Sequence, residues 1–140
     1  MSKTYHTQKD KMNSVLEEPI GGLYSPSLYQ LAFSEISKKY IKRVIKRTKL
    51  QVNEFIEILP ISIDTYKRKS TFNPPVTEKV LEIEEIYNRG LEAFGESFYD
   101  WMGTTNPALG NVTPKALLIN SFGIRMLLDE IGRLEHGILA

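Results

Sequence analysis

Apolar residues in this chain recur three and four positions apart over most of its length, which is the spacing of a helix that buries one face. Phe55, Ile56 and Leu59 form one such stripe with Val52, and Leu127, Leu128 and Ile131 belong to a longer one. No useful length of the sequence alternates between apolar and polar residues, as a half-buried strand would. We therefore predict an all-α fold.

The composition argues against the common kinds of enzyme. The chain has 140 residues and no cysteine, so it can form neither a disulfide nor a thiolate metal site. Its two histidines, His6 and His136, lie far apart in the sequence, and no glycine-rich phosphate loop or HExxH motif occurs. We expect a protein without catalytic residues, cofactor or metal.

No apolar run is long enough for a membrane span or typical of a secretory signal, so a cytoplasmic location without a membrane partner is expected. Proline, glycine and capping residues divide the chain into four predicted segments. The first is polar and interrupted by glycine and proline, which favours a flexible arm, although an arm that binds a partner is the alternative. The segments are residues 1–26, 27–76, 77–95 and 96–140.

The net charge of +1 hides a separation of charge along the chain. Residues 34–71 carry ten Lys and Arg against four Asp and Glu, whereas residues 77–100 carry two against seven. On a helical wheel the basic residues gather opposite an apolar face made of Ile36, Tyr40, Ile41, Val44 and Ile45. Such a stripe suits a polyanion, although a solvated lysine face is the simpler alternative. Its members are Lys38, Lys39, Lys42, Arg43 and Lys46.

Two short helices are predicted on either side of Pro60, which ends the first because it lacks an N–H group. Ser62 is a good N-cap for the second, which ends in Lys67, Arg68 and Lys69. The connection has the length that a helix-turn-helix uses. Pro74 and Pro75 are expected to lie in a non-helical connection, with Thr77 capping a long acidic helix that Gly95 stops.

Three further helices are expected after Gly95. The first contains Trp101, and a loop follows over residues 103–112. Thr113 and Pro114 form a cap and a first helical residue, which is a strong start signal. Ser121 is expected to cap the last helix and Gly137 to stop it, and residues 135–140 are expected to form a non-helical tail.

The order of these C-terminal features resembles the Xre/MbcA/ParS antitoxins of type II toxin–antitoxin systems. The toxin-binding domain of that family has an aromatic helix with a Trp, then Asn-Pro-x-Leu-Gly, Thr-Pro-x-x-Leu-Leu, a Gly that opens the last helix, and Glu-x-Gly near the end. The matching residues here are Trp101, Asn106, Pro107, Leu109, Gly110, Thr113, Pro114, Leu117, Leu118, Gly123, Glu135 and Gly137.

Residues 50–68 resemble the Xre-like helix-turn-helix of the same family, with Ile61 and Ser62 at the end of the turn and Thr65 and Arg68 on the recognition helix. The sequence departs from the family pattern at three positions. Pro60 stands where glycine is frequent, Ile56 where alanine is frequent, and Gln51 where a serine-like cap is usual.

The resemblance implies an antitoxin that dimerises, covers the active site of a RES-domain toxin that consumes NAD⁺, and represses its own operon. The NAD chemistry would belong to the toxin. The alternatives are a stand-alone helix-turn-helix regulator with a helical dimerisation domain, and an antitoxin that has lost operator binding because of the Pro60 turn. The predicted DNA-binding residues are Lys42, Arg43, Lys46, Ser62, Ile63, Asp64, Thr65, Lys67, Arg68 and Lys69.

Several candidates keep a second interpretation. Asp64 can simply stabilise the N-terminus of its own helix. Trp101 can belong to the core, Asn106 can fix its loop, and Arg125 can be a solvated surface charge. The predicted toxin-binding residues are Trp101, Asn106, Leu109, Arg125, Glu135, His136, Ile138, Leu139 and Ala140.

Overall fold

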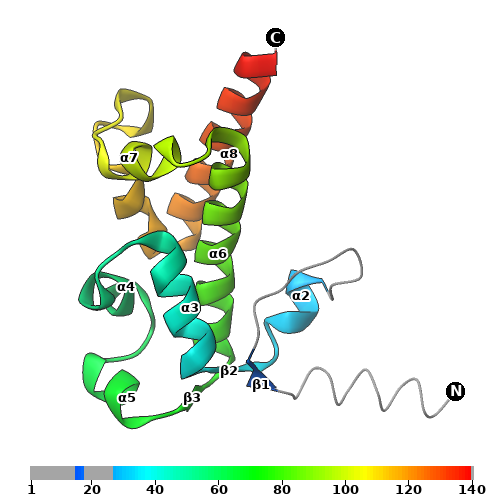
Figure 1. Ribbon diagram of the computed structural model, residues 1–140, viewed down its shortest axis with the longest axis vertical. Coiled ribbons are helices and arrows are strands. Elements are labelled where there is room, and N and C mark those ends of the chain that lie inside the picture. Colours follow the sequence, from blue (N-terminus) through cyan, green and yellow to red (C-terminus); the bar gives the residue numbers. More distant parts are fainter. Residues whose placement is uncertain (1–14, 18–26, 140) are drawn as a thin grey trace, which may run out of the picture. The chain divides into compact units, whose positions relative to one another are not determined.

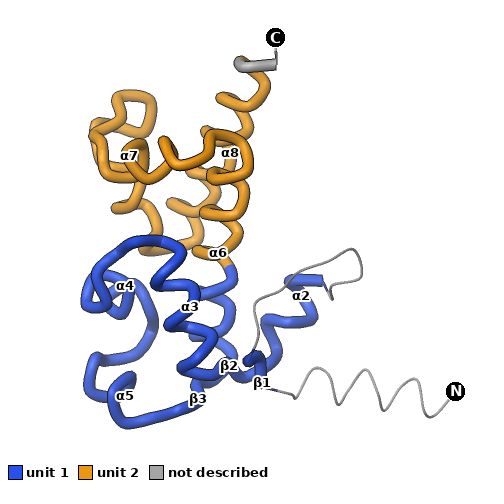
Figure 2. The backbone as a smooth tube through the Cα atoms, in the orientation of Figure 1, with its two compact units in different colours: residues 1–81 blue, residues 82–140 orange. Residues whose placement is uncertain are grey.

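The computed structural model describes residues 15–17 and 27–139, and the remaining part of the expected N-terminal arm lies outside the described residues. The chain divides into two compact units, residues 1–81 and 82–140 (Figure 2). We call them the N-terminal and the C-terminal unit. Helix α6, Pro74–Phe94, crosses this division, so each unit contains part of it.

The N-terminal unit combines short helices with a small sheet (Figure 1). The strands pair in the order β1-β2-β3, with β1 parallel and β3 antiparallel to β2. Ile36 pairs with Leu16 on one side and with Phe72 on the other. The elements are β1 Val15–Leu16, α2 Leu28–Leu31, β2 Glu35–Ser37, α3 Lys38–Thr48, α4 Val52–Ile58, α5 Ile63–Arg68 and β3 Thr71–Phe72.

The sheet corrects the prediction of an all-α fold, although helices dominate the described residues. Its strands have two or three residues, which is too short for alternation to register. Ile36, predicted to lie on a helix, is fully buried in β2. Val15 and Leu16, predicted to belong to a flexible arm, form β1.

Helix α3 begins later than the apolar spacing suggested, because Ser37 is its N-cap and accepts a hydrogen bond from the backbone N–H of Tyr40 at 3.1 Å. The predicted apolar face is confirmed from that point, since four of its residues are buried. These are Tyr40, Ile41, Val44 and Ile45. Phe55 and Ile56 of α4 and Tyr66 of α5 are also buried.

The prediction that Pro74 and Pro75 lie outside a helix is wrong, because α6 begins at Pro74. Proline fits the first turn of a helix, where its missing N–H would have no partner. Thr77 is therefore not the cap but lies inside the first turns, fully buried. Its hydroxyl donates to the carbonyl oxygen of Ser34 at 2.6 Å.

The C-terminal unit contains the end of α6 and a ring cluster around the fully buried Phe98. Phe98 packs edge-on against Tyr87 at 5.6 Å and stacks on Trp101 at 5.5 Å between ring centroids. Gly95, predicted to stop the long helix, has a φ of 62° just after its last residue. The further elements are α7 Ser97–Gly103, the 3₁₀ helices η1 Pro107–Leu109 and η2 Pro114–Ile119, and α8 Ser121–Leu139.

Two predicted boundaries in this unit are wrong and one helix has a different type. Pro114 is the first residue of a helix as predicted, but η2 is a 3₁₀ helix and Thr113 makes no side-chain cap bond. The last helix is capped by Asn120 rather than Ser121, because the Asn120 side-chain oxygen accepts from the N–H of Gly123 at 2.9 Å. Gly137 does not stop α8, which continues to Leu139.

Two glycines of α8 differ in what surrounds them, which allows a matched test of packing. A Cβ added to Gly123 would overlap the backbone carbonyl of Leu117, whereas one added to Gly132 would meet only the Arg89 guanidinium at 3.7 Å. We predict that Gly123→Ala lowers the free energy of unfolding by about 1–3 kcal/mol, as overpacking does. Gly132→Ala should leave it unchanged or raise it by up to about 1 kcal/mol through helix propensity.

Urea unfolding followed by circular dichroism measures both variants against the unchanged chain. Equal unfolding free energies for the two alanine variants would contradict the close approach of Gly123 to Leu117.

Candidate functional site

The two short helices predicted on either side of Pro60 are present as α4 and α5, and the start of each is capped by a side chain. The side chain of Glu54 accepts from the N–H of Gln51 at 3.0 Å before α4. Leu59 has an extended conformation, as a residue before proline prefers. Ser62 then caps α5 by accepting from the N–H of Thr65 at 3.1 Å. Helices α4 and α5 pack against each other across this short turn.

The predicted DNA-contacting residues of α5 differ in exposure. Asp64, Lys67 and Arg68 are exposed, as is Lys69 at the helix end, whereas Ile63 and Thr65 are half-buried. The exposed hydroxyl of Ser62 donates to that of Thr65 at 3.0 Å. Asp64 lies in the first turn, where its charge also suits the helix dipole. The C-terminal end of α5 therefore presents the positive charge of this helix.

Lys38 supports α5 rather than extending the basic stripe. Its ammonium group donates to the carbonyl oxygen of Lys67 at 3.0 Å and lies 5.2 Å from the centroid of the Tyr66 ring. Tyr66 in turn stacks on Phe72 at 5.9 Å, and burial raises the pKa of its hydroxyl. The first residue of α3 thus holds the last turn of α5.

The rest of the predicted stripe runs along α3. Lys42 and Lys46 are exposed, so their charges face solvent. Arg43 is half-buried, and its Nη1 donates to the carbonyl oxygen of Glu17 at 3.4 Å. Arg43 therefore helps to hold the residue that follows β1, and local sequence patterns cannot predict this contact because the two residues lie 26 positions apart.

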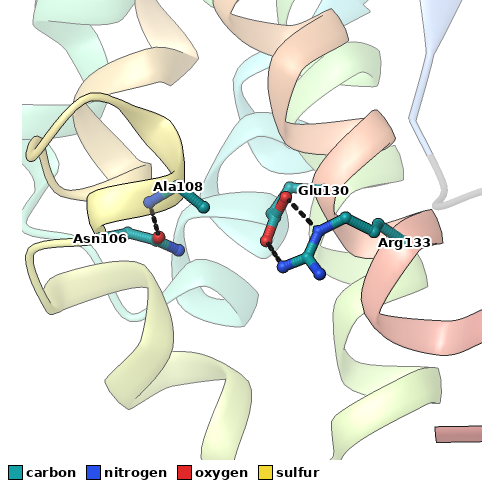
Figure 3. A network of polar contacts seen from close by, with 4 residues as sticks. All are labelled: Asn106, Ala108, Glu130 and Arg133. Carbon is teal, nitrogen blue, oxygen red and sulfur yellow. Dashed lines mark hydrogen bonds and ion pairs between the residues drawn. The ribbon is translucent and has the colours of Figure 1, made fainter. Parts of the chain in front are cut away.

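In the C-terminal unit, Asn106 organises the loop that follows α7. Its side-chain oxygen accepts from the N–H of Ala108 at 2.9 Å (Figure 3), and its own N–H donates to the carbonyl of Val112 at 2.9 Å. Leu109 is only 5% exposed, so its side chain lies in the core and cannot make a large contact with a partner. Both residues shape the loop from inside.

The remaining predicted toxin-binding residues are spread over α7 and α8. Trp101 is half-buried on Phe98, which leaves part of its ring accessible. Arg125 is exposed, with its guanidinium 5.7 Å from the centroid of the Phe122 ring. Phe122 was not predicted as a candidate residue, because the opposite apolar face with Leu127 and Ile131 already explained why this segment is helical.

The end of α8 is stiffened by charged side chains. Arg133 donates to both carboxylate oxygens of the buried Glu130 (Figure 3), and this hydrogen bonding lowers the pKa of Glu130. Arg89 and Glu135 lie 3.7 Å apart and join α6 to α8. His136, one turn before the helix ends, is exposed.

The prediction of a non-helical tail over residues 135–140 is wrong for residues 135–139, which belong to α8. Ile138 and Leu139 lie in its last turn, and Ala140 lies outside the described residues. Within the part of the chain that the structure describes, no group of His, Asp or Glu could hold a metal ion. No helix among the described residues is long and apolar enough to cross a membrane.

Residues 90–137, which include all of α7, η1 and η2, match the family model of the antitoxin Xre/MbcA/ParS C-terminal toxin-binding domain. An "Antitoxin Xre" of Yersinia enterocolitica serotype O:8 / biotype 1B is 31% identical over 72 residues, which is 49% of each chain. An "Antitoxin Xre" of Photorhabdus laumondii subsp. laumondii is 26% identical over 94 residues, which is 62% of this chain and 64% of that protein.

The chain thus spans about half of the first relative and just under two thirds of the second. Residues 90–137 are the region in which the sequence showed the Trp, Asn-Pro-x-Leu-Gly and Thr-Pro-x-x-Leu-Leu pattern. On these matches, residues 90–137 are similar to the toxin-binding domain of this family, and the chain is similar to proteins named Xre antitoxins.

Proposed function

We propose that this chain is the antitoxin of a type II toxin–antitoxin pair. In this proposal the C-terminal unit covers the active site of a RES-domain toxin, and the N-terminal unit represses the operon by binding its DNA. The match of residues 90–137 to a toxin-binding domain carries the first half of the proposal. The named relatives support the same assignment, since each is called an Xre antitoxin.

The proposed neutralisation is steric, so the chain needs a rigid surface but no reactive group. The loop of Asn106, the ring cluster of Phe98 and the Arg89–Glu135 pair supply that rigidity within the C-terminal unit. A preformed surface loses little conformational entropy when it binds, which favours tight association. We therefore assign no catalytic residue, metal or cofactor to this chain, and leave the chemistry to the toxin.

The proposed DNA contacts rest on the α4–α5 pair and on the charge around it. A recognition helix presents its first residues to the base edges of the major groove. Thr65 and Arg68 of α5 are the proposed base contacts, while Lys42 and Lys46 of α3 would bind phosphates. Helix-turn-helix proteins usually bind as dimers to paired half-sites, so a homodimer acting in the cytoplasm is part of the proposal.

DNA binding is tested with single substitutions on a fragment of the chain's own promoter. We expect Arg68→Ala to weaken binding by about 5- to 150-fold, because a bidentate contact to guanine discriminates by roughly 1–3 kcal/mol. Lys42→Ala should reduce the slope of log K against the logarithm of the salt concentration by about 1, the contribution of one phosphate contact. Arg125→Ala, in the other unit, is the control and should bind the fragment like the unchanged chain.

Fluorescence anisotropy across a salt titration measures all three variants. If both Arg68→Ala and Lys42→Ala bound DNA with unaltered affinity and unaltered salt dependence, α3 and α5 would have no role in DNA recognition. If the chain bound DNA but did not bind the proposed RES-domain toxin, it would instead be a stand-alone regulator.

Neutralisation is tested by removing residues 136–140, the last turn of α8 and the residue after it. The shortened chain keeps Glu135 and hence its ion pair with Arg89, so the unit should remain folded. We expect it to lose the ability to restore growth of cells that produce the toxin, while it binds promoter DNA normally. Full growth rescue by the shortened chain, at an equal unfolding midpoint, would exclude the end of α8 from neutralisation.

A further inference from the structure

We infer that the toxin is anchored on one outward patch at the start of α8, which we call the α8 patch. It is formed by Ile119, Phe122, Arg125 and Met126. The inference rests on the proposed function and adds to it the contact surface and the chemistry of the partner's complementary site.

The α8 patch exposes more apolar surface than folding requires. Ile119, Phe122 and Met126 are 64%, 70% and 42% exposed. Phe122 and Met126 are four residues apart and so lie on one helix face, and Ile119 ends η2 three residues before Phe122. A contiguous exposed apolar patch of this kind marks an interaction site, whereas apolar residues scattered singly do not.

The opposite face of α8 already supplies the core of the unit. Ile124, Leu127 and Ile131 are buried there. A helix with two apolar faces is expected to be covered on both of them. Among the described residues, the core of the unit covers one face of α8 and leaves the other exposed. All members of the α8 patch lie within residues 90–137, the part that matches a toxin-binding domain, which identifies a toxin as the occupant.

The patch is held rigid by the junction between η2 and α8. The side chain of Asn120 caps α8 through the N–H of Gly123 at 2.9 Å, and Gly123 packs directly on the backbone of Leu117. These contacts fix Ile119 and Phe122 on either side of the junction. Anchor residues that are preorganised in this way bind with a smaller entropic cost.

Arg125 defines the polar part of the partner's site. Its guanidinium lies over the Phe122 ring at 5.7 Å from the centroid, and its side chain is exposed. Arginine and large aromatic residues are the types most enriched in the energetic centres of protein interfaces. The complementary surface on the toxin is therefore an apolar pocket that receives Phe122, with a carboxylate at its rim for Arg125.

The test uses the full chain and a RES-domain protein as the proposed toxin, with affinity measured by isothermal titration calorimetry. We expect Phe122→Ala to weaken binding at least about 30-fold, as the loss of an interface anchor does. Arg125→Glu should weaken it by a similar factor, while Arg125→Lys should keep part of the affinity because the charge remains. Binding of promoter DNA and the unfolding midpoint should be unchanged in each variant.

Tyr29→Ala is the matched control. Tyr29 is 73% exposed and packs edge-on against Phe33 at 5.2 Å, so it is an equally exposed aromatic residue outside the matched domain. We expect the Tyr29→Ala variant to bind the toxin with an affinity within about twofold of that of the unchanged chain, which is a smaller change than the loss of a hot-spot residue causes.

Three results would overturn the inference. Equal toxin affinities of the Phe122→Ala variant and the unchanged chain would exclude the patch as the anchor while leaving the proposed function intact. Conversion of a dimer to a monomer by Phe122→Ala, seen in sedimentation at unaltered toxin affinity, would assign the patch to a contact between copies. Absence of binding by the unchanged chain would reject the proposed function as well.

Discussion

The close approach of Gly123 to the carbonyl of Leu117 is the contact on which the C-terminal unit most depends. A Cβ at position 123 would overlap the Leu117 carbonyl, so any residue other than glycine would force the two backbones apart where η2 turns into α8. Asn120 completes the junction by capping α8 through the N–H of Gly123, the third residue of that helix. The same junction decides which residues of α8 face inward, so Leu127 is buried and Phe122 is left outside. Packing and recognition are therefore set by one local constraint.

In the N-terminal unit the corresponding role falls to a charged residue. Lys38 binds the last turn of α5 through a carbonyl oxygen and through the face of Tyr66, which itself stacks on Phe72 of β3. The last carbonyls of a helix have no partner within it, and a lysine is well suited to satisfy one of them. A positive charge that would repel its neighbours on α3 thereby stabilises the position of the proposed recognition helix. Lys38 therefore has a structural role, whereas the charges of the exposed Lys42 and Lys46 face solvent.

The sequence predicts those structural features that depend on residues close together in the chain, and it fails where the interacting residues are far apart in the sequence. The apolar face of α3 from Tyr40 onward, the stop at Gly95 and the cap at Ser62 follow from spacing and local chemistry, and these were predicted correctly. The strand at Ile36 was missed because its partners, Leu16 and Phe72, lie far away in the sequence. Gly137 was read as a helix stop, but glycine ends a helix only where the backbone turns left-handed, and α8 continues through it. Burial of Leu109 also follows from tertiary packing, so a motif residue that resembled a contact proved to be core.

The two proposed surfaces differ in physical kind, and this difference explains why one small chain can carry both. The basic residues of α3 and α5 attract a polyanion through charge. That attraction weakens as the salt concentration rises, because the counterions that the protein displaces from the polyanion are then released less favourably. The α8 patch is mainly apolar and has one guanidinium, so its binding relies on removing Phe122 and its neighbours from water. Neither proposed surface suits the other proposed partner, because a DNA backbone is a line of phosphates with no pocket for Phe122, whereas the cleft of a protein toxin is not a uniform line of phosphates. Specificity between the two partners then follows from the sequence positions of charge and exposed apolar surface, without any reactive side chain.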